Sequence, residues 1–367
     1  MTSRREWLRN TSLSLAALGI GTNLTAMPTL RREDPSGRII LLNSNENAFG
    51  PSPSVVKAMQ DIAGKSNRYS DDEVKLLIKK LAAFHKVAPE NIIMSAGSSE
   101  ILGQTTLMAA QQGGSAVTAE PSFNPWTRMA AAFGVKVTSV PVDKEFKLDL
   151  LAMRAAIAPD TRMVYVCNPN NPVGTVINIE PLRAFVEEAS KKCLVLVDEA
   201  YTEFSNFQSL SALAITNPNI IIAKTFSKIY GLAGARIGYA IAHPATIKKF
   251  ETLQSWPNGQ LGHVNVAAAS AALDDQAFVK MCGDKTAELR QFCGQTFDKL
   301  KLPYIPSVTS FMMFNIDSIK CNYQEAMEKQ NIMVQHRNHF GGKWCRVSMG
   351  TMEEMKLFAK ALENICG

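Results

Sequence analysis

Short apolar stretches alternate with helical patterns from about residue 115 onward, and this alternation most constrains the fold. The expected strands are rich in Val, Ile, Leu and Ala: 116–119, 135–140, 163–167, 194–197, 220–223 and 237–242. Helical patterns lie between several of them, at 126–133, 148–157 and 179–191, the last with Pro181 in its first turn. Nearly continuous apolar strands separated by helices indicate an α/β fold, whose mostly parallel sheet is buried on both faces.

Polar residues follow three of these expected strands directly. Asn168 follows the third strand, Asp198 the fourth, and residues 225–228 the fifth. In open α/β sheets, ligands bind at the carboxyl ends of the strands. The sequence therefore predicts a ligand site that these three positions share.

Composition excludes several classes of function. The chain has 367 residues with a net charge of +6, but no run of five or six basic residues, so we do not expect nucleic-acid binding. The modest positive balance suits small anionic ligands. The seven cysteines and five histidines show no spacing typical of a metal or redox site. We interpret the cysteines as free thiols, mostly packed as small apolar side chains.

The first 27 residues differ from the rest. Ser3-Arg4-Arg5-Glu6-Trp7-Leu8-Arg9 precedes an uncharged stretch with small residues near Ala26. A charged start followed by a short apolar segment is typical of an export signal, and the paired arginines resemble a bacterial twin-arginine signal. We therefore expect a periplasmic protein exported after folding. The alternatives are a retained membrane anchor, or an amphipathic first helix of a cytoplasmic protein.

The remaining chain divides into two expected domains. Residues 63–262 contain the alternating strands and helices and form the large domain. Residues 263–367 begin with helical patterns and end with a strand near 343–348 and a helix over 352–365, which is typical of a smaller α+β domain. The segment 36–62 precedes the large domain, and we expect it to join the small one.

The stretch from Ala223 to Tyr239 has the most specific chemistry. It contains Lys228 just beyond a buried strand, where loss of hydration lowers the pKa of the amine and makes it a nucleophile toward an aldehyde. Thr225, Ser227 and Arg236 are donors suited to a phosphate group. A Ser-Lys pair alone is usually a solvated surface pair, but the preceding strand and the later arginine favour a cofactor site.

Three further segments have both an ordinary and a functional interpretation. Asp198 could cap the following helix, or it could hold a cofactor. The Asn168–Thr175 turn contains Asn171 and is rich in residues that favour turns anyway. Gly97, Ser98 and Ser99 precede the helical pattern 101–110, and the amide groups at a helix start bind anions.

Together these segments resemble the class I and II aminotransferases, pyridoxal 5'-phosphate (PLP) enzymes of fold type I, over roughly residues 40–367. The resemblance implies a mostly parallel seven-stranded sheet in a large domain, beside a smaller α+β domain. It implies that Lys228 forms a Schiff base (aldimine) with PLP and that Asp198 pairs with the pyridine nitrogen. Tyr201 and Asn171 would reach the ring 3-oxygen, and Phe123 would stack on the ring. The cofactor phosphate would be bound by Gly97, Ser98, Ser99, Thr225, Ser227 and Arg236.

Residues 42–53 and 67–71 resemble the corresponding segments of histidinol-phosphate aminotransferases. That resemblance implies that Tyr69 crosses to the cofactor phosphate of a second subunit, so that the enzyme is a homodimer with shared active sites. It also implies that Arg346 grips an anionic group of the substrate, with Asn47 and Arg337 as further substrate ligands.

One departure concerns the substrate. The family usually has an arginine in a G-I-x-V-R pattern where this chain has Gln335, while Arg337 lies two residues on and on the same face of an extended strand. With the export signal, this departure favours an amino acid donor of open identity and a 2-oxo acid acceptor. Histidinol phosphate, or the chemistry of a threonine-phosphate decarboxylase or a racemase, is the alternative. A PLP-fold binding protein without catalysis is the alternative of another class.

Overall fold

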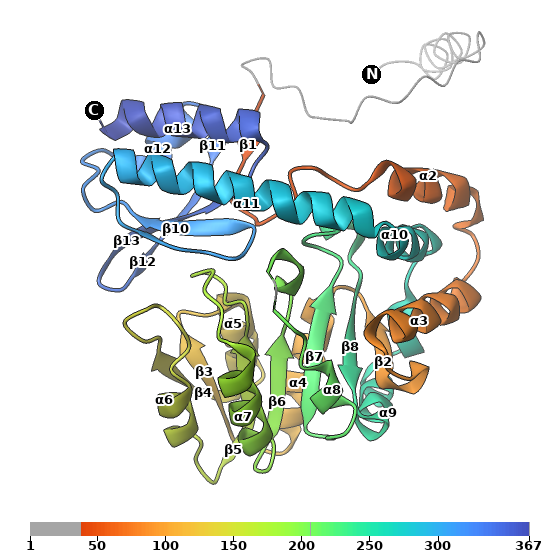
Figure 1. The fold of residues 1–367 in the computed structure, drawn as a ribbon. Coiled ribbons are helices and arrows are strands. Elements are labelled where there is room, and N and C mark those ends of the chain that lie inside the picture. The colour runs from red at the N-terminus through yellow and green to blue at the C-terminus, as the bar shows by residue number, and fades with distance from the viewer. Residues whose placement is uncertain (1–37, 206, 367) are drawn as a thin grey trace, which may run out of the picture. The chain divides into compact units, whose positions relative to one another are not determined.

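The computed structural model describes residues 38–205 and 207–366, so the predicted export signal over residues 1–27 lies outside them. The main sheet has seven strands in the order β2-β8-β7-β6-β5-β3-β4 (Figure 1). They are β2 (Ile92–Ser95), β3 (Ser115–Glu120), β4 (Lys136–Pro141), β5 (Thr161–Cys167), β6 (Leu194–Asp198), β7 (Ile220–Thr225) and β8 (Gly238–Ala242). Only β8 runs antiparallel to its neighbours in this sheet. The predicted α/β class with a mostly parallel seven-stranded sheet is confirmed.

Alternate residues of the central strands pack on opposite faces of the sheet. On β5, Val164 and Val166 belong to one apolar cluster, whereas Tyr165 belongs to the other, and all three are fully buried. Burial on both faces explains why these strands are continuously apolar. The first cluster includes residues of α3 (Asp71–His85), α6 (Leu150–Ala155), α7 (Ile179–Ala189) and α8 (Ser211–Ala214). The second includes residues of α4 (Ser98–Gln111), α5 (Asn124–Ala132) and α9 (Pro244–Leu253).

A second apolar core includes residues of a smaller antiparallel sheet, whose strand order is β12-β13-β10-β9. Its strands are β9 (Tyr304–Ile305), β10 (Phe311–Asn315), β12 (Gln335–His339) and β13 (Gly342–Ser348). The core also includes residues of α12 (Tyr323–Glu328) and α13 (Met352–Cys366). Strand β1 (Ile40–Leu41) pairs in parallel with β11 (Ile332–Met333), so the start of the described chain joins the small-domain core.

The two cores share the long helix α11 (Gln276–Lys299). Val279 and Cys282 near its start pack in the large-domain core, whereas Cys293 and Phe297 near its end pack in the small-domain core. Helices α2 (Pro53–Ile62) and α10 (His263–Asp274) contact each other and also contribute to the large-domain core. The domain boundaries expected at residues 62 and 262 stay a prediction.

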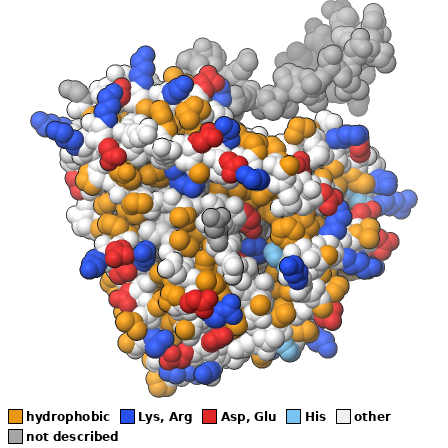
Figure 2. All heavy atoms as spheres, viewed as in Figure 1, with side chains coloured by type: hydrophobic (Ala, Val, Ile, Leu, Met, Phe, Trp, Pro, Cys, Tyr) orange, Lys and Arg blue, Asp and Glu red, His pale blue; other side chains and the backbone are white. Residues whose placement is uncertain are grey.

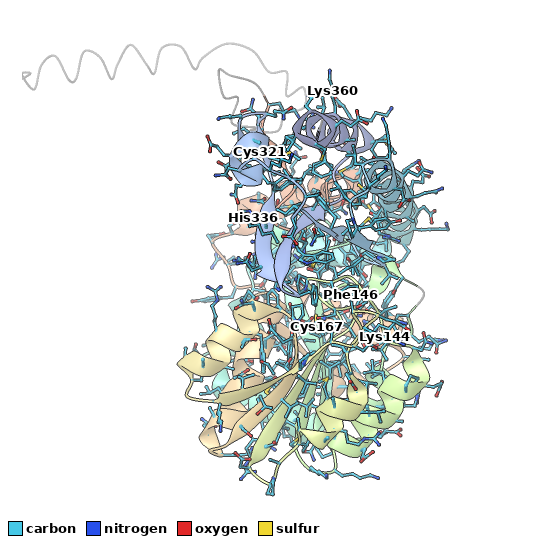
Figure 3. The ribbon with its side chains drawn as sticks, turned by 90° about the vertical axis from the view of Figure 1, so that its left-hand side faces the viewer. Lys144, Phe146, Cys167, Cys321, His336 and Lys360 are labelled. Carbon is cyan, nitrogen blue, oxygen red and sulfur yellow. The ribbon has the colours of Figure 1, made fainter. Side chains whose placement is uncertain are left out.

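The small sheet lies next to the carboxyl ends of the large-sheet strands. In Figure 3, Cys167 at the end of β5 lies below the strand that carries His336. Direct contacts join the two domains: Arg346 on β13 binds Asn171, and the Phe311 ring packs edge-on against the Tyr201 ring. Residues at the strand ends are therefore enclosed by the second domain.

The face seen in Figure 2 has no single dominant charge. Figure 2 shows acidic and basic side chains interspersed over the viewed face, with apolar side chains between them. In the part of the chain that the structure describes, no helix is both long enough and apolar enough to cross a membrane.

Candidate active site

Lys228 lies in the loop after β7, between the two domains. Its Nζ donates a hydrogen bond of 3.4 Å to the Asn45 carbonyl oxygen and lies 5.7 Å from the centre of the Tyr201 ring. Burial and the positive charge of Arg346 lower the pKa of Lys228 to about 8. A substantial fraction of this amine is therefore uncharged at mildly alkaline pH, as a nucleophile requires.

Lys224 lies on β7, four residues before Lys228, and the pKa of its amine is shifted in the opposite direction. Burial disfavours its ammonium group, but the carboxylates of Glu203 and Glu199 outweigh burial and raise the pKa of Lys224. Its Nζ lies 3.1 Å from Glu203 Oε1 and 3.2 Å from Glu199 Oε2. Lys224 therefore stays protonated and paired, which leaves Lys228 as the nucleophilic lysine of this segment.

Asp198 ends β6 with its carboxylate fully enclosed. Oδ2 accepts a hydrogen bond of 2.9 Å from the Tyr165 hydroxyl, and Oδ1 accepts one of 3.2 Å from the Ala200 amide. Burial raises the pKa of Asp198 to about 6, although these two hydrogen bonds and the Lys228 charge act against that rise. A buried carboxylate of this kind is stabilised by a cationic partner, such as a protonated ring nitrogen.

Tyr201 and Asn171 form one hydrogen-bonded group with Arg346. The Tyr201 oxygen accepts hydrogen bonds from Asn171 Nδ2 at 3.2 Å and from Asn45 Nδ2 at 3.1 Å. Arg346 donates from Nη1 to Asn171 Oδ1 at 2.8 Å and from Nη2 to the Asn43 carbonyl at 3.0 Å. The small-domain arginine is thus fixed beside the residues expected to hold the cofactor ring.

The expected phosphate ligands surround the start of α4. Gly97 has φ +80, and a Cβ at this position would lie 2.5 Å from Arg236 Nη2. A Cβ at Gly238 would lie 2.5 Å from the Ser98 backbone nitrogen. Both glycines therefore let the start of the helix approach Arg236 and β8 closely, so that amide groups and a guanidinium converge as an anion site requires.

Most of the predicted cofactor ligands line one cavity of about 180 Å³. They are Ser98, Ser99, Phe123, Asn171, Asp198, Tyr201, Thr225, Ser227, Lys228 and Arg236. The enclosed carboxylate, the cradle at the helix start and the amine between them fit the ring nitrogen, phosphate and aldehyde of PLP. The predicted residues at this cavity are therefore compatible with that cofactor.

A second cavity of about 400 Å³ adjoins the first, and Phe123, Asn171 and Arg346 line both. Its volume lies within the range of small-molecule sites. Gln335, Arg337, Trp344 and Arg346 line this cavity from the small domain, and Glu120, Phe123 and Arg128 line it from the large domain. Arg337 thus shares a face with Gln335, as the extended-strand argument predicted.

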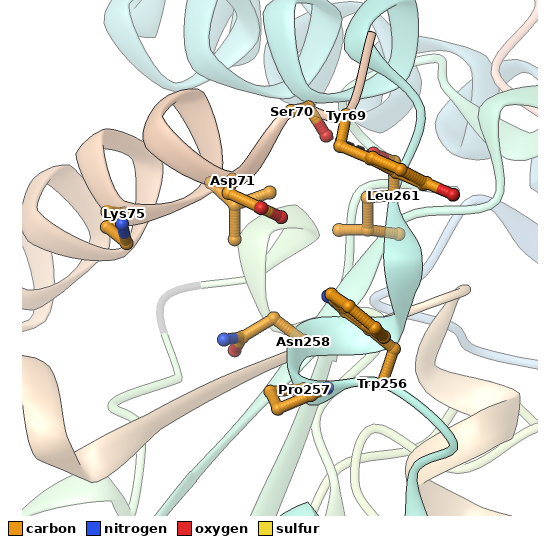
Figure 4. A pocket seen from close by; sticks show the side chains of 9 residues that line it. Tyr69, Ser70, Asp71, Lys75, Trp256, Pro257, Asn258 and Leu261 are labelled. Carbon is orange, nitrogen blue, oxygen red and sulfur yellow. Dashed lines mark hydrogen bonds between the residues drawn. The ribbon is translucent and has the colours of Figure 1, made fainter.

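Two predicted site residues lie elsewhere within the chain. Tyr69 is 78% exposed and lines a separate cavity, where its ring stacks on Trp256 with centroids 6.2 Å apart (Figure 4). Asn47 lines neither of the two adjoining cavities. Its amide nitrogen binds the Ile229 carbonyl at 2.7 Å, and its oxygen accepts from the Phe49 amide, so the substrate role expected of Asn47 stays a prediction.

Sequence reasoning overlooked Asn45, which lines the Lys228 cavity. Asn45 is buried with φ 55, a left-handed conformation that Asn tolerates well. Its side-chain oxygen and amide nitrogen bind Ser348 and Tyr201, and its backbone binds Ser348 and Lys228. Asn45 belongs to the run Asn-Ser-Asn-Glu-Asn at residues 43–47, and the sequence alone does not show which of these asparagines faces the cavity. Tyr165, Arg128 and Trp344 were also overlooked.

The described residues contain no group of three or more His, Cys, Asp or Glu side chains that could hold a metal ion.

Comparison with known proteins agrees with this geometry. Residues 37–362 match the family profile "Aminotransferase class I and II". Curated histidinol-phosphate aminotransferases are similar to the chain. That of Brevibacillus brevis is 36% identical over 342 residues (92% of this chain, 93% of the relative), and that of Moorella thermoacetica is 35% identical over 332 residues (89% and 85%).

A solved structure has a similar fold. It is the histidinol-phosphate aminotransferase from Sinorhizobium meliloti in complex with pyridoxal-5'-phosphate, with a TM-score of 0.83 and 30% sequence identity. The match covers 94% of this chain and 95% of the other.

The glycine contacts give a matched pair of variants. Gly238→Ala should lower the free energy of unfolding by about 1–3 kcal/mol, since its Cβ would overlap backbone atoms of residues 97, 98 and 224. It should also weaken cofactor affinity, because the Ser98 amide must move. Gly234→Ala meets no atom within 4 Å and should change stability by no more than about 0.5 kcal/mol. Urea unfolding and cofactor titration measure both effects, and equal behaviour of the two variants would refute the close approach.

Proposed function

We propose, since this chain belongs to the class I and II aminotransferases, that it transfers the amino group of a phosphorylated amine of the histidinol-phosphate type to a 2-oxo acid. The predictions of a PLP-dependent transaminase with the type I fold are confirmed by that membership. Sequence reasoning left the donor open and favoured an ordinary amino acid. The relatives and the charge of the second cavity favour the phosphorylated amine.

The charge of the second cavity carries this proposal. Three guanidinium groups line it, those of Arg128, Arg337 and Arg346, against the single carboxylate of Glu120. His339 also lines it, but burial and the charges of Arg337 and Arg346 lower its pKa, so it adds no positive charge near neutral pH. Three cations and one anion leave a balance of two positive charges. A phosphate monoester has a charge of about −1.5 to −2 at neutral pH and matches this balance.

The residues of the first cavity can be given roles in the reaction. Bound PLP supplies an electron-withdrawing ring that stabilises negative charge at the substrate α-carbon. Asp198 would hold the ring nitrogen, Tyr201 and Asn171 the ring oxygen, and the start of α4 with Arg236 the phosphate. Lys228 would hold the cofactor aldehyde at rest. Its freed amine would take the proton from the substrate α-carbon and deliver it to the former aldehyde carbon, since its lowered pKa lets it act as base and acid near the working pH.

The small domain orients the substrate and excludes water. Arg346 reaches the border of both cavities and is held by Asn171 and the Asn43 carbonyl. An anion bound there fixes the donor relative to Lys228. Such positioning lowers the barrier to proton transfer.

A donor screen with the Lys228→Ala variant tests the proposed function. The native enzyme should convert histidinol phosphate, with a 2-oxo acid as acceptor, faster than unphosphorylated amino acids. Lys228→Ala should lose the visible absorbance of the bound cofactor and at least about 1000-fold of the rate, because one residue serves as both nucleophile and base. Lys248→Ala removes an exposed lysine of α9 and serves as the matched control.

Three outcomes would contradict the proposed function. Turnover of Lys228→Ala at the native rate would contradict the role of Lys228. Preference for a common amino acid would restore the donor that sequence reasoning favoured. Release of CO₂, or racemisation without amino transfer, would indicate decarboxylase or racemase chemistry.

We further propose that the enzyme is a homodimer in which Tyr69 serves the partner's cofactor phosphate. Its exposed ring supports this role, because it lines a cavity separate from the Lys228 cavity and stacks on the exposed Trp256, and aromatic residues are enriched at protein interfaces. Sedimentation should therefore give twice the chain mass of 40.2 kDa. Tyr69→Phe should weaken cofactor affinity by about tenfold, the value of one hydrogen bond to a charged group. A monomer with full activity would contradict the shared site.

Export remains a proposal based on the sequence of residues 1–27. Arg4→Lys combined with Arg5→Lys should retain the protein in the cytoplasm, because a twin-arginine signal is read through its arginine pair. Cell fractionation with activity staining measures the distribution. Periplasmic recovery of the double variant at the native level would refute this signal.

A further inference from the structure

Four of the side chains that line the second cavity from β12 and β13 form one square on the sheet: Gln335, Arg337, Trp344 and Arg346. In the antiparallel register, Gln335 lies opposite Arg346 and Arg337 lies opposite Trp344. Arg337 is therefore the diagonal neighbour of Arg346, with Cα atoms roughly 7–8 Å apart by ordinary sheet geometry. An arginine side chain is long enough to span this separation toward a shared ligand. The neutral Gln335, directly opposite Arg346, contributes no charge.

Arg128 lines the same cavity from α5 of the large domain. Neither Arg128 nor Arg337 has a side-chain hydrogen bond or ion pair with another described residue, although Glu120 lines the cavity beside them. Both side chains are exposed, and exposed arginines of a folded chain often remain solvated. Their common cavity, however, places both guanidinium groups where a bound anion would meet them.

Buried donors beside these arginines point to a ligand. Trp344 is only 8% exposed, and its Nε1 has no hydrogen-bond partner among the described residues; the buried Nε of Arg346 is likewise unpartnered there. Both side chains line the cavity. Leaving a buried donor unpaired is costly, so such groups in native proteins usually meet a ligand or ordered water. An excess of donors and positive charge fits an anionic acceptor.

We propose that Arg128 and Arg337 complete, with Arg346, the substrate-anion subsite of this chain, and that they replace the arginine usual at position 335. The subsite binds the phosphate of the donor, an assignment that rests on the proposed function. Because Arg128 belongs to the large domain and Arg337 to the small one, a phosphate held between them also links the two domains. Both arginines thus determine specificity by touching the substrate.

The test compares histidinol phosphate with histidinol as donors of the holoenzyme. Arg337→Gln and Arg128→Gln should each raise KM for histidinol phosphate about 10- to 100-fold with little change in kcat, the loss expected for hydrogen bonds to a charged group. KM for histidinol should stay within about twofold, because that donor lacks the phosphate. Arg162→Gln, whose guanidinium binds the Pro159 carbonyl and lines neither cavity, controls for the loss of one positive charge.

A rescue variant separates substrate recognition from a structural role. Adding Gln335→Arg to Arg337→Gln should restore most of the lost affinity for histidinol phosphate, because it returns the second guanidinium to the position opposite Arg346. An unchanged KM in both single variants would overturn the subsite. Equal losses for histidinol and histidinol phosphate would also overturn it, since they would show that the arginines act on the fold.

A separate measurement distinguishes failure of the subsite from failure of the proposed function. If the native enzyme does not convert histidinol phosphate, the proposed function fails. The subsite is then judged by competitive inhibition with inorganic phosphate against the best donor found. Weaker inhibition of Arg337→Gln and Arg128→Gln by at least fivefold would support it, and unchanged inhibition constants would overturn it.

Discussion

The desolvation of one amine governs the chemistry of this protein. Lys228 is enclosed at the junction of the two domains, where burial and the nearby Arg346 charge lower its pKa to about 8. Lys224, four residues earlier on β7, is buried as well, yet Glu199 and Glu203 keep it protonated. Burial alone therefore does not make a reactive lysine. Lys228, in contrast, forms no salt bridge with a carboxylate among the described residues, so burial lowers the pKa of its amine.

Strand order places the partners of Lys228 within reach. Asn171, Asp198 and Lys228 follow β5, β6 and β7, which are adjacent parallel strands, so their carboxyl ends meet at one edge. The reversed β8 then brings Gly238 against the start of α4 and completes the phosphate cradle. The small domain closes this edge through Arg346. One edge of a sheet thus holds the cofactor, while the junction with the second domain selects the substrate.

The sequence predicted most of the sheet because its central strands are buried on both faces and are therefore mostly apolar. Strand β2 was overlooked, since four residues, Ile92–Ser95, are too few to distinguish a strand from a short buried turn. Lys228 and Asp198 were identified because each follows an apolar run, Arg236 because it is a phosphate donor shortly after Lys228, and Tyr201 through the resemblance to the aminotransferases. Long-range placement was harder to predict. The choice between Asn45 and Asn47 depends on a left-handed backbone at Asn45, and the contribution of Arg128 depends on how the domains meet.

The identity of the lysine that binds the cofactor tests this account most directly. The holoenzyme can be reduced with borohydride, digested and mapped by mass spectrometry, so that the pyridoxyl group marks the amine to which the cofactor was joined. The electrostatics of β7 predict the label on Lys228 and none on Lys224. A label on Lys224, or no label on either lysine in a protein that retains PLP, would contradict the central role of Lys228.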